Sequence, residues 1–479
     1  MPENKYETVI GLEVHVQLST RTKIFCGCST VFGQEPNTQV CPVCLGLPGV
    51  LPVLNEEVFK RAIKVALALD CDIQKTVKFD RKNYYYPDLP KNYQISQYDM
   101  PIAYDGKISI KMNDQEKTIG ITRVHMEEDA GKLLHDPVKA FSYVDLNRTG
   151  TPLLEIVSEP EMTSSEEAYN YLVMIKRVIA YLDVSDCNME EGSLRCDANL
   201  SLRKKGEKKL GTKVEIKNLN SFKAVRDALI FEEDRQEEIL GSGKKIVQET
   251  RLWNEERSVT ESMRIKEEAH DYRYFSEPDL VPFEIEKGLI EEIKRSMPED
   301  PSERTKRLKD TFKLSDNDTE FLISEKRIAD FFEKTVEEHN IPNDVCNWIK
   351  TEVMMHAKER GKKIDQLGLS PKNLAIIIKM AKEGVVSGLA AKEVLGEHID
   401  KGKDPGEIVK EKGLEQVSDE SVLDEVVDSV LSENERSVED YKKGKINALS
   451  FMVGQVMKKT KGKANPKIAR EMLLKKMEK

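Results

Sequence analysis

The chain has 479 residues, of which 39% are hydrophobic and 33% charged, and its formal net charge is −10. This length exceeds what one hydrophobic core serves and predicts about three domains. The composition is that of a soluble globular protein, and no run of roughly eighteen apolar residues predicts a membrane span. The net negative charge argues against nucleic-acid binding over the whole surface. The first residues carry neither an apolar signal core nor an Arg-rich leader, so a cytoplasmic location is expected.

The stretch from Val9 to Leu18 alternates between apolar and polar side chains, which predicts a β-strand. Its aliphatic residues would face a core, and Glu13, His15 and Gln17 would share the opposite face. Carboxylate and imidazole groups two residues apart on a strand can converge on one ion. The alternative is a strand whose polar face meets only solvent.

Four of the eight cysteines form two close pairs, Cys26-Gly-Cys28 and Cys41-Pro-Val-Cys44. Each pair can direct two thiolates toward one ion, and the twelve-residue spacer returns the chain to complete a tetrahedron. Four thiolates that leave no open position favour a structural zinc ion. Reduced thiols without a metal are the alternative.

Two later stretches also carry acidic residues in unusual places. Glu127, Glu128 and Asp129 follow one another beside Arg123 and His125. Adjacent carboxylates repel one another unless a cation is near, which suggests a divalent metal. An exposed acidic turn would explain the same run without one.

Glu155 interrupts the apolar stretch Leu153–Val157, where a buried carboxylate normally needs a partner. Oxygen ligands from separate strands would suit magnesium, and an imidazole would bind it through water or favour manganese. The candidate magnesium ligands are Glu13, His15, Glu127 or Glu128, and Glu155.

The chain contains neither a GxxxxGK[ST] phosphate loop nor a GxGxxG motif. If a nucleotide binds, the candidate partners for its phosphates are Arg81, Lys82 and Arg148, through charge-assisted contacts. The alternative for each is an ordinary basic residue on the surface.

Residues 6–286 predict a mixed α+β block. Helices are expected over 56–69, 163–182 and 222–240, and strands over 107–112, 117–126, 198–203, 213–217 and 248–251. Thr163-Ser-Ser-Glu166 fits a capping box at the second helix. Beyond the Pro-rich stretch at 296–301 the pattern is helical throughout, with a second linker at 401–406. The expected domains are 1–295, 296–404 and 405–479.

The C-terminal segment differs in charge from the rest of the chain. From Lys442 to Lys479 there are twelve Lys or Arg residues against two Glu residues, directly after an acidic segment. This asymmetry predicts either a local phosphate-binding surface or lysine-rich helix ends that are simply solvated.

Seven stretches together resemble the B subunits of the tRNA-dependent amidotransferases, the GatB type of the GatB/GatE family. They are Gly11–Leu18, Phe79–Pro87, His125–Lys132, Asp145–Glu155, Glu190–Asn199, Asp271–Phe275 and Ser437–Lys442. The archaeal relative with the same N-terminal domain carries a large extra insertion that is absent here, which favours the B type.

The resemblance implies an α+β, kinase-like cradle domain over 1–295 with a zinc-ribbon insertion at 26–44, an all-α helical domain and a small all-α tail that binds tRNA. It also implies a ligase that uses ATP, Mg²⁺ and a structural Zn²⁺ to amidate Glu-tRNA(Gln), Asp-tRNA(Asn) or both. Ammonia would come from a glutaminase A subunit, with a small C subunit joining the complex and no membrane involved. The family's magnesium site falls on Glu13, His15, Glu128 or Glu127, and Glu155 of this chain, and its zinc site on the cysteine quartet.

Two other functions fit parts of the sequence. A non-catalytic zinc-ribbon scaffold that binds tRNA would leave the acidic groups of three strands unexplained. A metal hydrolase would use those groups to activate water. ATP hydrolysis that depends on charged tRNA distinguishes the three, because a scaffold would show none and a free hydrolase would not need the tRNA.

Overall fold

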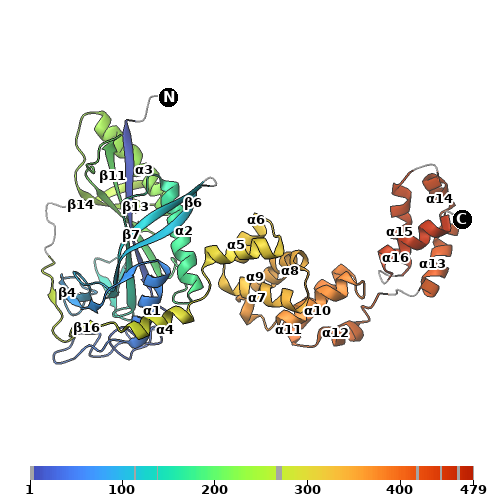
Figure 1. The fold of residues 1–479 in the computed structure, drawn as a ribbon, viewed down its shortest axis with the longest axis horizontal. Coiled ribbons are helices and arrows are strands. Elements are labelled where there is room, and N and C mark those ends of the chain that lie inside the picture. The colour runs from blue at the N-terminus through green and yellow to red at the C-terminus, as the bar shows by residue number, and fades with distance from the viewer. Residues whose placement is uncertain are drawn as a thin grey trace. The chain divides into compact units, whose positions relative to one another are not determined.

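The computed structural model describes residues 5–112, 115–136, 139–265, 272–416, 420–442, 445–460 and 464–477. The chain forms two compact units, one up to Pro301 and one from Ser302 onward. The first combines a mixed sheet with helices and the second is helical, so the expected class, α+β followed by all-α, is confirmed (Figure 1). Within the described part of the chain, no helix is both long and apolar enough to cross a membrane.

The first unit is built on a nine-stranded sheet with the order β14-β13-β12-β11-β1-β10-β7-β6-β2. In that order the strands are Val259–Ile265, Glu249–Asn254, Val214–Leu219, Leu194–Lys204, Tyr6–Gln17, Pro152–Ser158, Gln115–Glu128, Ala103–Met112 and Asp72–Ile73. All neighbours are antiparallel except β12 and β13. The strand predicted from alternation, β1, lies at the centre of this sheet between β11 and β10.

Three small sheets surround the long one. The sheet that matters for the site has the order β15-β4-β5 and comprises Phe275–Ser276, Asp80–Asn83 and Tyr93–Ser96. The others pair β16 (Phe283–Glu284) with β3 (Thr76–Val77), and β8 (Lys132–His135) with β9 (Ser142–Asp145).

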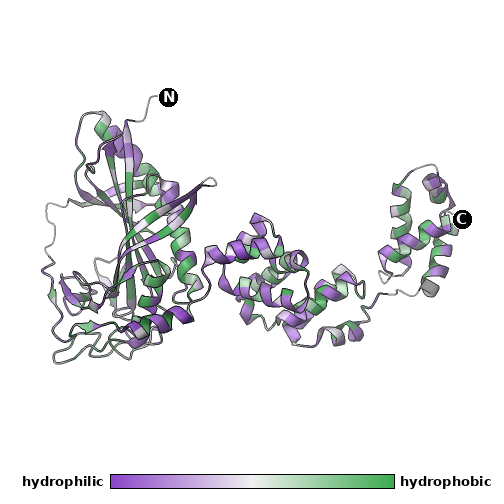
Figure 2. Cartoon of the chain, in the orientation of Figure 1, coloured by the Kyte–Doolittle hydropathy of each residue, from purple (hydrophilic) through white to green (hydrophobic). Residues whose placement is uncertain are grey.

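The core of the first unit lies on the aliphatic face of β1. Leu12, Val14 and Val16 are at most 1% exposed and belong to the same buried cluster as Leu172 and Ile175 of the helix α2. The alternating pattern therefore separates a core face from a polar face, as predicted. Figure 2 shows the same alternation of hydrophobic and hydrophilic residues along the strands of the sheet.

Among the described residues of this unit, four α-helices complete the fold: α1 (Glu56–Ala68), α2 (Ser165–Tyr181), α3 (Phe222–Gly241) and α4 (Lys287–Ser296). The first three were predicted within two residues at each end. The cap of α2 lies one residue later than expected, since the Ser164 hydroxyl accepts from Glu167 N and the Glu167 carboxylate accepts from Thr163 N. Two backbone donors at the helix start are thereby satisfied.

The second unit consists of short helices. They are α5 (Pro301–Phe312), α6 (Asp316–Leu322), α7 (Lys326–Glu338), α8 (Pro342–Trp348), a π-helical turn (Ile349–Val353), α9 (Met354–Glu359), a 3-10 turn (Ile364–Gln366), α10 (Pro371–Lys382), α11 (Gly388–Lys401), α12 (Pro405–Lys412), α13 (Glu420–Glu433), α14 (Glu435–Lys442), α15 (Asn447–Lys459) and α16 (Pro466–Met477). Ser370 caps α10, with Pro371 at its first position.

The last four helices bury a hydrophobic cluster of their own, which includes Leu423, Val427, Leu449, Met452 and Leu473. The division of the chain into domains at 295 and 404 stays a prediction. Asp271, the first residue of one family-like stretch, lies outside the described residues.

Candidate active site

The pairing of four antiparallel strands fixes the polar face of the long sheet. Directly opposed residues in antiparallel strands point to the same side, so partners across β11, β1, β10 and β7 form rows. From β11 to β7, one row is Asp197, Glu13, Val157 and Arg123, and the next is Arg195, His15, Glu155 and His125. A third row adds Gln17, Leu153 and Glu127. Charged groups far apart in the sequence thus meet on one surface.

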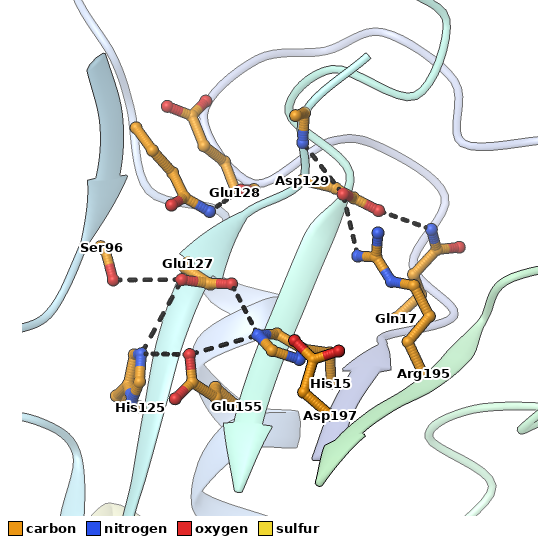
Figure 3. A network of polar contacts seen from close by, with 12 residues as sticks. His15, Gln17, Ser96, His125, Glu127, Glu128, Asp129, Glu155, Arg195 and Asp197 are labelled. Carbon is orange, nitrogen blue, oxygen red and sulfur yellow. Dashed lines mark hydrogen bonds and ion pairs between the residues drawn. The ribbon is translucent and has the colours of Figure 1, made fainter. Parts of the chain in front are cut away.

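At the centre of these rows two imidazoles and two carboxylates lie close together in one cluster (Figure 3). The His15 Nε2 atom lies 3.2 Å from a Glu155 oxygen and 3.5 Å from a Glu127 oxygen. The His125 Nε2 atom lies 3.4 Å and 3.8 Å from oxygens of the same two glutamates. Ligand atoms of His15, Glu127 and Glu155 all lie within 4.8 Å of one another, close enough to share one cation.

Electrostatics inside the cluster favour charged carboxylates. Burial lowers the pKa of His125, but the attraction of Glu155 and Glu127 outweighs it and raises that pKa to about 9. Burial raises the pKa of Glu155, but the charge of His125 and its hydrogen bond hold the pKa well below its ordinary value. Before any cation enters, the imidazoles therefore supply the positive charge that two adjacent buried carboxylates require.

The cluster opens into a cavity of about 640 Å³ between the long sheet and the small β15-β4-β5 sheet. Its lining includes most of the rows above, with Lys82, Ser96 and Gln94 on the small-sheet side. The Ser96 hydroxyl donates to Glu127 across 3.3 Å, which joins the two sheets at the cluster. Basic groups also reach the cavity, namely Lys82, Arg123, Arg195, Lys213 and Lys217. A cavity with central carboxylates and peripheral cations suits a metal-bound polyphosphate.

Glu13 opens onto the same cavity, one row from the close cluster. The Asn199 amide donates to its Oε1 atom across 2.9 Å, which orients the carboxylate. The structure therefore brings four of the candidate magnesium ligands to one cavity, and these are Glu13, His15, Glu127 and Glu155.

Glu128 points to the other side of β7. Its carboxylate forms an ion pair with Lys91 and accepts from Ile95 N across 2.8 Å, and it is buried away from the cavity that His15 faces. The physical reason is the two-residue period of the strand, because neighbours point in opposite directions. Glu127, and not Glu128, is therefore the residue that lies beside His15.

The three basic residues predicted for phosphates differ in position. Lys82 lines the cavity, where burial lowers its pKa but the charge of Glu127 raises it overall. Arg81 is engaged elsewhere, since its guanidinium donates to both Glu277 oxygens across 2.6 and 2.8 Å. Arg148 donates to Ala130 O and Gly131 O, across 3.0 and 2.6 Å, and so holds the loop after β7. Neither arginine is among the residues that line the cavity.

The four clustered cysteines come together as the sequence predicts, with all four sulfurs within 4.8 Å of one another. Cys41 N donates to the Cys44 sulfur across 3.2 Å, and the buried Lys23 ammonium lies 3.6 Å from it. The hydrogen bond from Cys26, aided by Lys23, lowers the pKa of Cys44 to about 4. Four sulfur ligands this close together, one of which is readily deprotonated, fit a structural zinc ion.

Comparison with known proteins identifies the family to which this geometry belongs. Residues 8–291 match the GatB/GatE catalytic domain, and residues 330–477 match the GatB domain. The chain belongs to the GatB/GatE family. The B subunit of the aspartyl/glutamyl-tRNA(Asn/Gln) amidotransferase of Carboxydothermus hydrogenoformans is 54% identical over 478 residues, 99% of either chain. The protein of the same name from Brevibacillus brevis is 50% identical over 470 residues, 98% of either chain.

Some residues of this GatB/GatE site were not predicted from the sequence. His125 completes the close cluster, and Asp129 accepts from Arg195 and Gln17 across 2.9 and 2.8 Å at the cavity edge. The signal was present, because His125, Glu127 and Asp129 occupy alternate positions of one strand and its continuation. Asp197, which forms an ion pair with Lys217, follows the same period on β11.

Proposed function

We propose that the chain is the synthetic subunit of an aspartyl/glutamyl-tRNA(Asn/Gln) amidotransferase, which converts the side-chain carboxylate of a mischarged aminoacyl-tRNA to an amide. Full-length relatives at 50–54% identity are named as the B subunit of that enzyme. The observation that carries the proposal is the His15–Glu127–Glu155 cluster, because it gathers cation ligands from three strands inside a cavity rimmed with basic groups.

The reaction needs activation because a carboxylate is a poor electrophile whose leaving group would be oxide. Transfer of the γ-phosphoryl group of ATP to a carboxylate oxygen breaks the bond to ADP and forms an acyl phosphate. Ammonia then attacks the carbonyl carbon, phosphate leaves, and the nitrogen loses a proton to give the amide. Phosphoryl transfer of this kind depends mainly on positioning and charge stabilisation, both of which this cavity offers.

The donor set fits a hard divalent cation such as Mg²⁺, or Mn²⁺ given the imidazole. Glu127 and Glu155 would supply oxygen ligands, His15 a nitrogen ligand, and Glu13 a further carboxylate one row away. When bound, the cation would neutralise charge on the phosphate oxygens during transfer. His125, which contacts both carboxylates, would keep them oriented.

The basic side chains of the cavity would bind the phosphates. Lys82 lies on the small-sheet side and Arg123 and Arg195 on the long-sheet side. Arg195 is already oriented by Asp129, which also accepts from Gln17, so its guanidinium is fixed before substrate arrives. Preorganised cations of this kind lower the cost of developing charge in the transition state.

We further infer that the ammonia comes from a glutaminase A subunit, that a small C subunit joins the complex, and that the cysteine cluster holds a structural zinc ion. The basic helices α15 and α16 would bind the tRNA backbone through salt-dependent contacts, with Lys458 and Lys475 of their last turns as candidates. The neighbouring Lys459 and Lys476 already form ion pairs with acidic residues of α13.

The test is ATP cleavage by the complete complex. The proposal expects ADP formation that depends on mischarged tRNA and amide formation that depends on glutamine. A scaffold protein would give no cleavage in any condition, and a metal hydrolase would cleave ATP without tRNA. Either result would contradict the proposal.

A further inference from the structure

Four tyrosines line one wall of the cavity opposite the charged rows: Tyr84, Tyr98, Tyr272 and Tyr274. Tyr84 directly follows β4 and Tyr98 follows β5, whereas the other two immediately precede β15. The small sheet therefore assembles this wall from segments almost two hundred residues apart in sequence.

The wall is held by backbone contacts independent of any ligand. Asn83 N donates to Tyr272 O across 2.8 Å, and the Asn83 side chain donates to Arg273 O across 2.8 Å. Phe275 pairs with Arg81 in the β15-β4 ladder, and the guanidinium of Arg81 is bound in turn by Glu277. A wall fixed in this way is preorganised for a rigid ligand.

The rings form a continuous aromatic surface. Tyr98 and Tyr274 stack with their centroids 4.2 Å apart and an interplanar angle of 10°. Tyr272 meets Tyr274 and Tyr84 edge-on, with centroids 6.2 and 5.9 Å apart. These tyrosines are not part of the hydrophobic core, because the core cluster of the described residues contains none of the four and Tyr98 is 52% exposed. Exposed aromatic faces in a polar cavity mark a place where a flat ring can bind.

The wall, the lysine and the carboxylates follow one another across the cavity. The Lys82 Nζ atom lies 4.9 Å from the ring centroid of Tyr272 and 6.0 Å from that of Tyr84. Lys82 and the carboxylates of Glu127 and Glu155 line the same cavity. A nucleotide has the same order, with its base at one end, phosphates in the middle and the cation on the terminal phosphate.

We propose that this tyrosine wall binds an adenine ring by stacking and so positions an adenosine-bearing substrate against the carboxylate cluster. The inference rests on the proposed function, whose two large substrates both carry adenosine. One is ATP, and the other is the aminoacyl-tRNA, which ends in a 3′-terminal adenosine. The spatial order of tyrosine rings, Lys82 and carboxylates matches the order of base, phosphates and cation in ATP.

The experiment replaces single rings in the complete complex. Tyr274→Leu and Tyr98→Leu remove the stacking surface, whereas Tyr274→Phe and Tyr98→Phe retain it and serve as matched controls. Stacking of one base contributes about 1–3 kcal/mol, so each Leu variant is expected to weaken one substrate by roughly 5- to 150-fold. The Phe variants should stay within about twofold of the unchanged complex.

Two arms identify the source of the adenine. If ATP binds here, the Leu variants raise the KM for ATP and weaken its binding in equilibrium dialysis, but leave the binding of tripolyphosphate, which has no base, unchanged. If the tRNA end binds here, they raise the KM for mischarged tRNA. They then also weaken inhibition by uncharged tRNA, but not inhibition by tRNA that lacks its terminal adenosine. Either result supports the tyrosine wall as an adenine site.

The inference is overturned if both substrates keep their KM and binding in the Leu variants, if kcat alone falls, or if Phe is as harmful as Leu. A failure of the proposed function is distinguishable, because the unchanged complex would then lack tRNA-dependent ATP cleavage. The dialysis comparison of ATP with tripolyphosphate would still report on the wall.

Discussion

The two ligand clusters of the first unit have similar spacing but different surroundings. In both, the candidate ligand atoms lie within 4.8 Å of one another. The cysteine cluster has four sulfurs and leaves no position for a substrate, whereas the His15–Glu127–Glu155 cluster has three ligands and faces a cavity. A closed set of soft ligands suits a structural ion, and an open set of hard ligands suits chemistry. Openness to the cavity and ligand type, not spacing, therefore distinguish the two clusters.

The largest expected effect comes from the open cluster. Glu155→Gln keeps the shape of the side chain but removes the charge that contacts both imidazoles. We expect kcat for tRNA-dependent ATP cleavage to fall by at least about a hundredfold. Binding of mischarged tRNA, measured by filter binding, should change less than about twofold. If the circular dichroism spectrum showed that the variant is unfolded, the loss of activity would reflect lost structure and would contradict a catalytic role.

Two adjacent glutamates give a matched pair for the same cluster. Glu127→Gln should abolish ATP cleavage in the way that Glu155→Gln does, because Glu127 faces the cavity. Glu128→Gln should retain cleavage but lower the free energy of unfolding by about 3 kcal/mol, since the ammonium of the buried Lys91 loses its partner. Denaturant unfolding and ADP release measure the two effects. If Glu128→Gln abolished cleavage in a fully stable protein, the assignment of faces would be wrong.

Removal of the closed cluster should affect stability more than chemistry. The double change Cys26→Ser and Cys44→Ser is expected to abolish zinc binding and to lower Tm by about 10 °C. At 25 °C the kcat of the folded protein should stay within about fivefold. Metal analysis and thermal unfolding test this, with Cys346→Ser in the helical unit as a control that keeps the zinc. Loss of kcat at unchanged Tm would assign the cysteines to catalysis.

The smallest effect concerns a region remote in sequence from both clusters. A chain that ends at Gln416 lacks the helices α13 to α16. It keeps the buried Ile408 and Val409 and the hydrogen bond from Gln416 N to Val385 O. We expect the KM for tRNA to rise by roughly tenfold, with kcat nearly unchanged. The KM rise should shrink as salt increases. Equal changes in KM and kcat would contradict a tail that only binds.

The sequence predicted the polar face of β1 because a strand alternates with a fixed period. The same rule could have decided between Glu127 and Glu128, since Val124 and Met126 have the parity of Glu128 and are fully buried. Alternation along β7 is therefore enough to place Glu127 on the polar face and Glu128 on the buried one. It says nothing about which strands become neighbours, so the meeting of His15 with Glu155 could not be derived from spacing alone.

The basic residues were harder to predict, because their roles depend on partners that are distant in the chain. Arg81 is engaged by Glu277, 196 positions away, and Arg148 by carbonyls of the loop after β7. No local pattern distinguishes such an arginine from one that is free to bind phosphate. The tyrosine wall was equally hidden, since Tyr84 and Tyr272 lie near each other only after β15 joins β4.

The central position of β1 limits how this protein can evolve. Inserting one residue directly before Glu13 would shift the following residues of β1 by one position against β10 and β11. Val14 would then face the cavity in place of His15, and the Glu13 carboxylate would point into the hydrophobic core. One inserted residue would thus disrupt both the packing of the core and the arrangement of the site. Exchanging side chains along this strand or lengthening the loops around it preserves the two faces, whereas an insertion within the paired segment exchanges them.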